Sequence, residues 1–135
     1  MLIKGLQKLT LLDFPEKMAC TVFTFGCNFR CPFCHNASLV LADCADGAII
    51  EEEDFFKFLR SRRGILEGVC ISGGEPTLRA DIVELVEHAR WFVTRLNTNG
   101  VLLNEALCQK LRDASLDSVQ ITLYSHDEDT HNALV

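Results

Sequence analysis

The chain has 135 residues, of which 48% are hydrophobic and 24% charged, with a net charge of −6. This length is enough for one domain with a substantial core, and the composition excludes intrinsic disorder. The acidic balance and the lack of a basic patch in the sequence argue against nucleic-acid binding. No apolar run approaches the roughly 20 residues that cross a bilayer, and residues 1–14 lack signal-peptide features, so we expect a cytoplasmic protein without membrane contact.

Strands and helices alternate along the predicted chain. Residues 2–12 are expected to add a strand or hairpin at the open edge of the sheet. The four strands and three helices expected after it are strand 18–25, helix 51–63, strand 69–72, helix 77–90, strand 92–96, a helix that Asn104 caps, and strand 118–124. Apolar residues at helical spacing support the helices, and we expect the inward-facing side chains to be Phe55, Phe58, Leu59, Ile82, Leu85, Val86, Ala89, Leu107 and Leu111. Thr77 is the expected cap of the second helix.

This alternation predicts an α/β fold with a parallel sheet, whose right-handed crossovers place every strand's carboxyl end at one edge. Polar or metal-binding residues follow each predicted strand. They are Cys27, the run 73–76 (GGEP), the run 97–100 (NTNG) and the pair 125–126 (SH). Such folds build their active sites at this edge, so we expect these four loops to form one site.

Three of the seven cysteines, Cys27, Cys31 and Cys34, fall within eight residues. An odd number of cysteines and no export signal argue against a disulfide scaffold. Soft thiolates select zinc or an iron–sulfur cluster, and three of them on a four-iron cluster leave one iron open. Four alternatives remain: c-type haem attachment at 31–35, a thioredoxin-type dithiol at 31–34, a closed zinc site with a fourth ligand, and buried thiols without a ligand.

The other four cysteines, Cys20, Cys44, Cys70 and Cys108, lack the spacing of a second cluster. We expect them to be buried apolar residues, except that Cys44 is a candidate for the surface.

The C-x3-C-x2-C triplet, the GGE at 73–75 and the TNG at 98–100 together resemble the radical S-adenosylmethionine (SAM) superfamily. The resemblance implies a partial (β/α) TIM-like barrel as a single core domain over residues 1–135. It implies a [4Fe–4S] cluster on Cys27, Cys31 and Cys34, with SAM on the open iron. Further implied SAM contacts are Gly73 and Gly74, where the backbone can approach the ligand closely, and Glu75 at its amino group. Phe33 is implied near the adenine, and Asn97 and Asn99 near the ribose or carboxylate. His35 is not expected to be a ligand.

Two stretches, 5–15 and 21–36, resemble the activating protein of anaerobic ribonucleoside-triphosphate reductase, a glycyl radical enzyme activase. This implies hydrogen abstraction from a glycine of that partner, with flavodoxin or ferredoxin as electron donor. The second half departs from activases, because Asn97 replaces their Asp and residues 120–126 lack their Asp-x-Lys. That stretch is more similar to radical SAM enzymes that modify peptides, so a peptide or small-molecule substrate is an alternative. A truncated cluster-binding protein without turnover is another.

The superfamily core is a (β/α)6 partial barrel, whereas about four parallel strands are predicted here. We therefore expect the first part of that barrel, apparently truncated, with an unpaired edge on strand 118–124. Unpaired strand edges promote association, so the chain is expected to self-associate unless that edge is covered.

Overall fold

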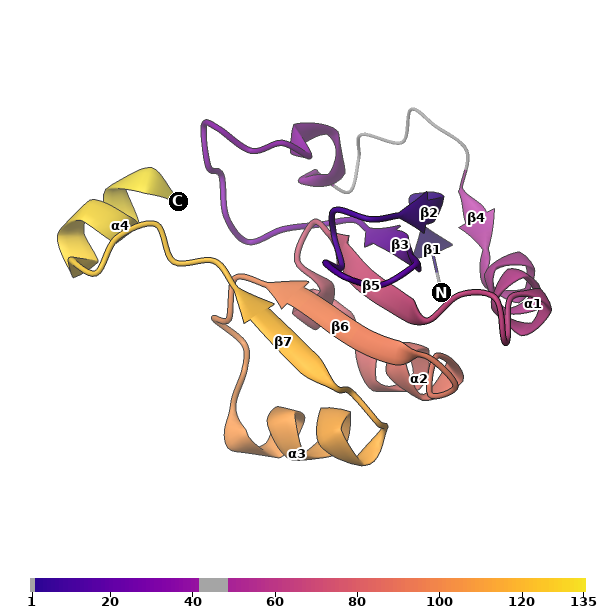
Figure 1. Ribbon diagram of the computed structural model, residues 1–135. Coiled ribbons are helices and arrows are strands. Elements are labelled where there is room, and N and C mark those ends of the chain that lie inside the picture. Colours follow the sequence, from indigo (N-terminus) through magenta and orange to yellow (C-terminus); the bar gives the residue numbers. More distant parts are fainter. Residues whose placement is uncertain (1, 42–48) are drawn as a thin grey trace.

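The structure, a computed structural model, describes residues 2–41 and 49–135. Five strands form its main sheet, in the order β2-β3-β5-β6-β7 (Figure 1). Their bounds are Gly5–Thr10 (β2), Ala19–Thr24 (β3), Gly68–Gly73 (β5), Val93–Thr98 (β6) and Ser118–Ile121 (β7). β2 runs antiparallel to β3, and the other neighbours are parallel. The four predicted parallel strands and the extra N-terminal strand at the sheet edge are therefore confirmed.

Four α-helices and two 3-10 helices connect or follow the strands, and a short antiparallel pair of strands lies outside the main sheet. The α-helices are Glu52–Ser61 (α1), Ile82–His88 (α2), Glu105–Asp113 (α3) and Glu128–Leu134 (α4). The 3-10 helices are Ala37–Leu39 (η1) and Pro76–Leu78 (η2), and the short strands are Leu2–Ile3 (β1) and Ile50–Glu51 (β4). None of these described helices is long and apolar enough to cross a membrane.

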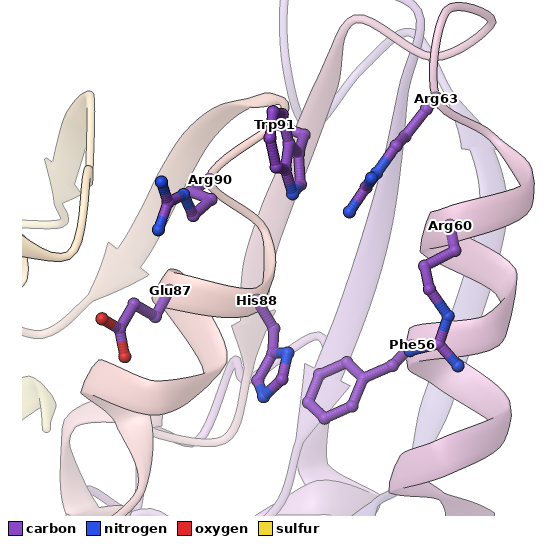
Figure 2. A pocket seen from close by; sticks show the side chains of 7 residues that line it. All are labelled: Phe56, Arg60, Arg63, Glu87, His88, Arg90 and Trp91. Carbon is purple, nitrogen blue, oxygen red and sulfur yellow. The ribbon is translucent and has the colours of Figure 1, made fainter.

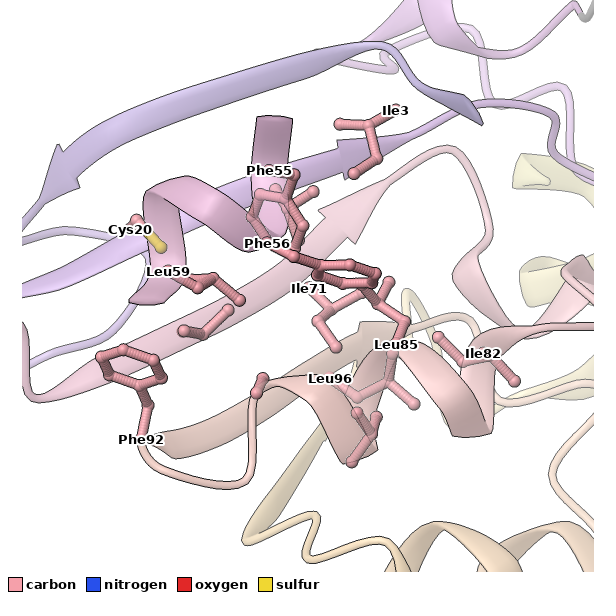
Figure 3. Close-up of a cluster of buried hydrophobic side chains, with 14 of the residues drawn as sticks. Ile3, Cys20, Phe55, Phe56, Leu59, Ile71, Ile82, Leu85, Phe92 and Leu96 are labelled. Atoms are coloured by element: carbon pink, nitrogen blue, oxygen red, sulfur yellow. The ribbon is translucent and has the colours of Figure 1, made fainter. Parts of the chain in front are cut away.

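The hydrophobic core lies between one face of the sheet and helices α1, α2 and α3 (Figure 3). Alternate strand residues point into it because side chains alternate between the faces of a strand. The strands contribute Cys20, Val22, Val69, Ile71 and Leu96, and the helices contribute Phe55, Phe56, Leu59, Ile82, Leu85, Val86 and Leu111. The opposite face carries the intervening residues, which are largely polar, and this is the face that leads to the site.

Helix positions differ from the sequence expectation in two places. Phe56 is buried, whereas Phe58, which we expected to face inward, is only partly covered. Thr77 does not cap a long helix, because its backbone N–H donates to the Glu75 carboxylate and closes a 3-10 turn. The α-helix then begins at Ile82. The expected cap of α3 is confirmed, since the Asn104 side chain accepts from the backbone of Leu107.

Two further expectations are wrong. Strand β7 ends at Ile121 rather than at residue 124, because its partner β6 ends at Thr98, opposite Ile121. Cys108 is exposed, because the face of α3 that meets the sheet carries Leu111 and, in part, Leu107. The expected burial of Cys20 and Cys70 is confirmed. The expected surface position of Cys44 lies outside the described residues.

Candidate cofactor site

A cavity of about 410 Å³ lies at the carboxyl ends of β3, β5, β6 and β7. It brings together all nine residues that the sequence singled out, and these are Cys27, Cys31, Phe33, Cys34, Gly73, Gly74, Glu75, Asn97 and Asn99. The remaining lining comprises Phe29, His35, Asn36, Ser72, Thr98, Gln120, Thr122 and Tyr124. Residues of the first three predicted loops therefore meet at one edge as expected, whereas the fourth predicted loop, 125–126, does not line the cavity.

The cysteine loop begins directly after β3 and is closed by its own hydrogen bonds. Gly26 adopts a left-handed φ of 82°, which turns the chain out of the strand. Its N–H donates to the Leu39 carbonyl at 2.7 Å, and the Cys27 N–H donates to the Val40 carbonyl at 3.1 Å. Inside the loop, the Arg30 guanidinium donates to the Cys27 carbonyl at 2.6 Å. These bonds hold the ends of the loop together at the mouth of the cavity.

The three thiols are partly accessible and face the same cavity. Burial raises the pKa of the Cys27 thiol, opposed by the Phe29 N–H, which donates to its sulfur at 3.4 Å. The described residues contain no group of three His, Cys, Asp or Glu side chains arranged around a single metal ion. A [4Fe–4S] cluster binds its thiolates through different irons, so its ligands need not converge on one point. This donor set, three soft thiolates on one loop, fits such a cluster.

The glycines after β5 allow two backbone segments to touch. The Gly74 N–H donates to the Thr24 carbonyl at 3.1 Å, and the Glu75 N–H donates to the Gly26 carbonyl at 2.7 Å. A Cβ on Gly73 would collide with the backbone of Thr24, and one on Gly74 would collide with that of Gly26. The reason for glycine here is thus contact between the β5 and β3 loops, in addition to any approach by a ligand.

Glu75 is 1% exposed, and its carboxylate ties two loops together. Oε1 accepts hydrogen bonds from the Thr77 backbone at 3.0 Å, from the Thr77 hydroxyl, and from the Thr98 hydroxyl at 2.6 Å. Oε2 accepts from the Asn99 N–H at 2.7 Å. Buried carboxylates require such donors, and charge-assisted bonds of this kind are strong. The carboxylate therefore fixes the shape of the cavity wall.

Asn97 and Asn99 differ in how their side chains are used. Asn99 donates to the Asn28 side chain at 2.8 Å and accepts from the Val101 N–H at 3.1 Å, which links β6 to the cysteine loop. Asn97 Oδ1 is buried, lines the cavity, and receives no hydrogen bond from any described residue. An unpaired buried acceptor costs about 1–3 kcal/mol, so this amide is prepared for a donor from a bound ligand.

Aromatic residues that the sequence analysis missed cover the cysteine loop. Phe33 packs edge-on against Tyr124, with ring centroids 4.8 Å apart. His131 of α4 stacks near Tyr124 and meets Phe29 edge-on at 6.3 Å. Tyr124 also hydrogen-bonds the Cys31 thiol, and burial together with the nearby thiols raises the pKa of this tyrosine. One feature of the sequence pointed to Tyr124 as a site residue, namely its position at the end of the fourth predicted strand.

Comparison with known proteins identifies the family. The model of the radical SAM superfamily matches residues 21–135. The chain belongs to the radical SAM superfamily. Members of this superfamily use a [4Fe–4S] cluster and SAM, and the family therefore assigns these cofactors to the chain. The predicted resemblance and the α/β fold class are confirmed.

The curated relatives of this chain are named for two different activities. A Methanocaldococcus jannaschii protein named as a glycyl-radical enzyme activating enzyme is 32% identical over 118 residues, covering 83% of this chain and 47% of that protein. Two proteins named as GTP 3′,8-cyclases are also similar. The Thermoplasma volcanium protein is 33% identical, covering 80% of this chain and 33% of its own length. The Saccharolobus solfataricus protein is 35% identical, covering 79% and 34%.

Among solved structures, the crystal structure of BtrN in an open conformation shares this radical SAM fold with a TM-score of 0.58. Its sequence is 18% identical, and the match covers 82% of this chain and 51% of that one. At this identity the likeness concerns the fold alone. The chain spans a third to a half of the length of the curated relatives that it matches.

Proposed function

We propose that Cys27, Cys31 and Cys34 hold the [4Fe–4S] cluster and that SAM occupies the adjoining cavity, within one core domain over residues 1–135. The support is the meeting of three thiols with an unpaired buried amide in the same cavity. When bound, the cluster supplies the electron that cleaves SAM to methionine and a 5′-deoxyadenosyl radical, which removes hydrogen from a substrate. The protein binds, orients and shields these groups from water.

Each of the remaining predicted site residues has its own role in binding SAM. Asn97 offers Oδ1 to a hydroxyl or ammonium group of SAM, because no described residue satisfies that atom. Phe33, backed by Tyr124, offers an exposed ring for the adenine. Gly73, Gly74 and Glu75 surround the SAM amino group, with the Glu75 carboxylate held in place by the bonds that it accepts. Hydrogen bonds to Asn28 and Val101 hold the Asn99 side chain in place. Its backbone and its side-chain amide are both offered to the ribose or carboxylate of SAM.

The reaction that we propose is hydrogen abstraction from a glycine of a partner glycyl radical enzyme, an anaerobic ribonucleotide reductase. The observation that carries this proposal is the activase-like sequence at 5–15 and 21–36, together with a relative that is named as an activating enzyme. The cavity is not enclosed, and a protein loop needs such access to reach a radical formed there. A flavodoxin or ferredoxin donor and a cytoplasmic location stay predictions from the sequence.

A second candidate is a peptide or small molecule as the substrate. Gln120, Thr122 and Tyr124 line the cavity and come from the stretch that departs from the activase pattern. Two relatives are named as GTP 3′,8-cyclases, which gives a small-molecule substrate independent support. A protein that holds the cluster without turnover is the third outcome.

The chemistry is tested by anaerobic reconstitution with iron and sulfide, followed by SAM and a reductant. We expect about four irons per chain and formation of 5′-deoxyadenosine. Cys31→Ala should abolish both, whereas Cys108→Ala, on the exposed face of α3 outside the cavity, should change neither. A wild-type chain that holds iron and never cleaves SAM would contradict enzymatic turnover. Loss of iron binding in both variants would contradict the assigned ligands.

The substrate is tested separately with the reconstituted protein. Incubation with SAM, a reductant and an anaerobic ribonucleotide reductase should produce a protein-based glycyl radical signal in electron paramagnetic resonance. If SAM cleavage proceeds but no such signal forms, the activase assignment is wrong and the small-molecule or peptide alternative is favoured. Omission of the reductase provides the matched control.

A further inference from the structure

A second cavity, of about 400 Å³, lies between the carboxyl ends of α1 and α2 (Figure 2). The turns after these helices lead into β5 and β6, so this cavity lies at the amino ends of the parallel strands. The cysteine loop lies at their carboxyl ends. A six-residue strand is roughly 20 Å long, which separates the two cavities. The proposed function uses no residue of this second cavity.

Flat rings line this second cavity. The His88 imidazole stacks on the Phe56 ring, with centroids 3.8 Å apart and an interplanar angle of 23°. Trp91, the only tryptophan of the chain, is 61% exposed at the same cavity. An exposed indole leaves a large apolar face in water, and such a face is suited to stacking with another flat ring.

Two guanidinium groups converge on that indole. The Arg63 guanidinium carbon lies 4.4 Å from the Trp91 ring centroid, and that of Arg90 lies 5.6 Å from it. Neither arginine takes part in an ion pair within residues 2–41 and 49–135. Arg60, by contrast, is paired with Glu53 at 2.6 Å. Two like charges held near one ring repel each other, and a bound anion would reduce that repulsion.

Cations near helix carboxyl ends are common because they complement the helix dipole. This explains Arg60, in the last turn of α1. It does not explain why Arg63 and Arg90, from two different turns, meet at one exposed indole beside a cavity. In Figure 2 the Arg63 side chain points from the turn after α1 toward Trp91, across the opening between the helices.

We propose that this cavity binds a nucleoside phosphate, with its phosphates at Arg63 and Arg90 and its base against the exposed Trp91 ring. Guanidinium groups bind phosphate oxygens through two parallel N–H bonds. Bases stack favourably on aromatic side chains. The cavity volume lies in the range of small-molecule sites. The overall charge of −6 opposes long polyanions, so a small ligand is favoured over a nucleic acid.

The single tryptophan makes the test direct. ATP is titrated into the cluster-free chain while Trp91 fluorescence is excited at the red edge, where the nucleotide does not absorb. We expect a saturable change that weakens as salt is added, with a matching rise in the melting temperature. The double variant Arg63→Gln/Arg90→Gln should bind at least tenfold more weakly. The matched double variant Lys8→Gln/Lys110→Gln removes two exposed charges elsewhere and should bind as the wild type does.

Several outcomes would overturn this proposal. It is wrong if ATP changes neither the fluorescence nor the melting temperature of the wild-type chain, a result that needs no variant. It is also wrong if the arginine variant binds ATP as tightly as the lysine variant. Tripolyphosphate binding as tightly as ATP would exclude a role for the base, and adenosine doing so would exclude the arginines. Because no cluster is needed, failure here is independent of SAM cleavage.

Discussion

The Thr98 hydroxyl donates a hydrogen bond to Glu75 Oε1 at 2.6 Å, and this bond joins the end of β6 to the loop after β5. The Asn99 N–H adds a second bond, to Oε2 of the same carboxylate. Both strand ends carry residues that line the cofactor cavity. The wall of that cavity is therefore held by the buried side chain of Glu75.

Removal of this hydroxyl should loosen the wall while leaving the carboxylate in place. Thr98→Val keeps the shape of the side chain but deprives a buried carboxylate of one donor, so we expect a loss of about 1–3 kcal/mol in the free energy of unfolding. Urea unfolding of the cluster-free chain measures it. Thr130→Val, which removes an exposed hydroxyl bond to Asp127, is the control and should cost less. Equal losses of unfolding free energy in the two variants would show that the bond to buried Glu75 stabilises the fold no more than an exposed hydroxyl bond does.

Asn97 should matter for SAM and little for the fold. Asn97→Ala removes a buried acceptor that no described residue satisfies, so stability should change by less than about 1 kcal/mol. SAM affinity, measured by calorimetry on the reconstituted protein, should fall roughly tenfold, as expected for one lost hydrogen bond. Asn104→Ala, which removes the cap of α3, should show the reverse, costing about 1 kcal/mol of stability without affecting SAM. A stability loss without an affinity loss in Asn97→Ala would contradict the assignment.

Substitution of Gly73 or Gly74 should cost more stability than substitution of a glycine that has open space around it. Gly74→Ala would place a methyl group against the Gly26 backbone, and we expect a loss of roughly 2–4 kcal/mol together with poor cluster binding. Gly64 has a left-handed φ of 77° but open space around it, so Gly64→Ala should cost only about 1–2 kcal/mol. Thermal unfolding and iron content measure the difference. Similar costs at both positions would mean that the loops do not need this contact.

Alkaline pH should destabilise the fold through its buried thiols. Burial raises the pKa of both Cys20 and Cys70 to about 12, from an ordinary 9.0. Their contribution is complete below pH 9 and is lost as the pH rises toward 12, because the unfolded thiols ionise while the folded ones stay protonated. The slope is about 1.4 kcal/mol per pH unit for each thiol.

Urea unfolding between pH 8 and 10.5 measures that slope. Cys70→Ala should reduce it by about half, although it also lowers stability at all pH values through lost packing. Cys108→Ala, at an exposed position, should leave the slope unchanged. A wild-type stability that stays constant across this range would contradict the burial of the two thiols.

Self-association should depend on β7, the edge strand of the sheet. Ile121 is 55% exposed there, and an apolar strand edge offers unpaired backbone groups to another chain. Sedimentation of the wild-type chain should show oligomers that grow with concentration, and Ile121→Lys should reduce them. Leu12→Lys replaces an equally apolar and still more exposed side chain outside any strand, and should not. A wild-type chain that stays monomeric at every concentration would refute the expectation.

The strand-end site could be predicted from sequence because the motifs and the strand pattern are both local. Cys27 follows β3, while Gly73 and Asn97 lie at the carboxyl ends of β5 and β6, and parallel pairing leaves only one edge at which they can meet. What could not be predicted is how they use their side chains. Glu75 and Asn99 bond to other loops, and those bonds join residues that are 24 and 71 positions apart in the sequence.

The second cavity was hidden for a similar reason. The sequence shows no basic patch, because Arg63 and Arg90 lie in separate turns of an acidic chain. Arg90 is next to Trp91 in the chain, and the packing of α1 beside α2 brings Arg63 to the same ring. The error at Cys108 has another cause, since the pattern on α3 left open how wide its buried face would be. Leu111 alone is fully covered on that helix.

The Arg30 guanidinium bonds two carbonyls of its own loop, those of Cys27 and Phe29. Together with the bonds to Leu39 and Val40, it shapes the loop using groups of the polypeptide alone. In small zinc domains the metal itself drives folding, and the empty chain is disordered. Here the polypeptide itself supplies part of what sets the loop's shape, so Arg30 supports a loop whose cysteines are the proposed cluster ligands.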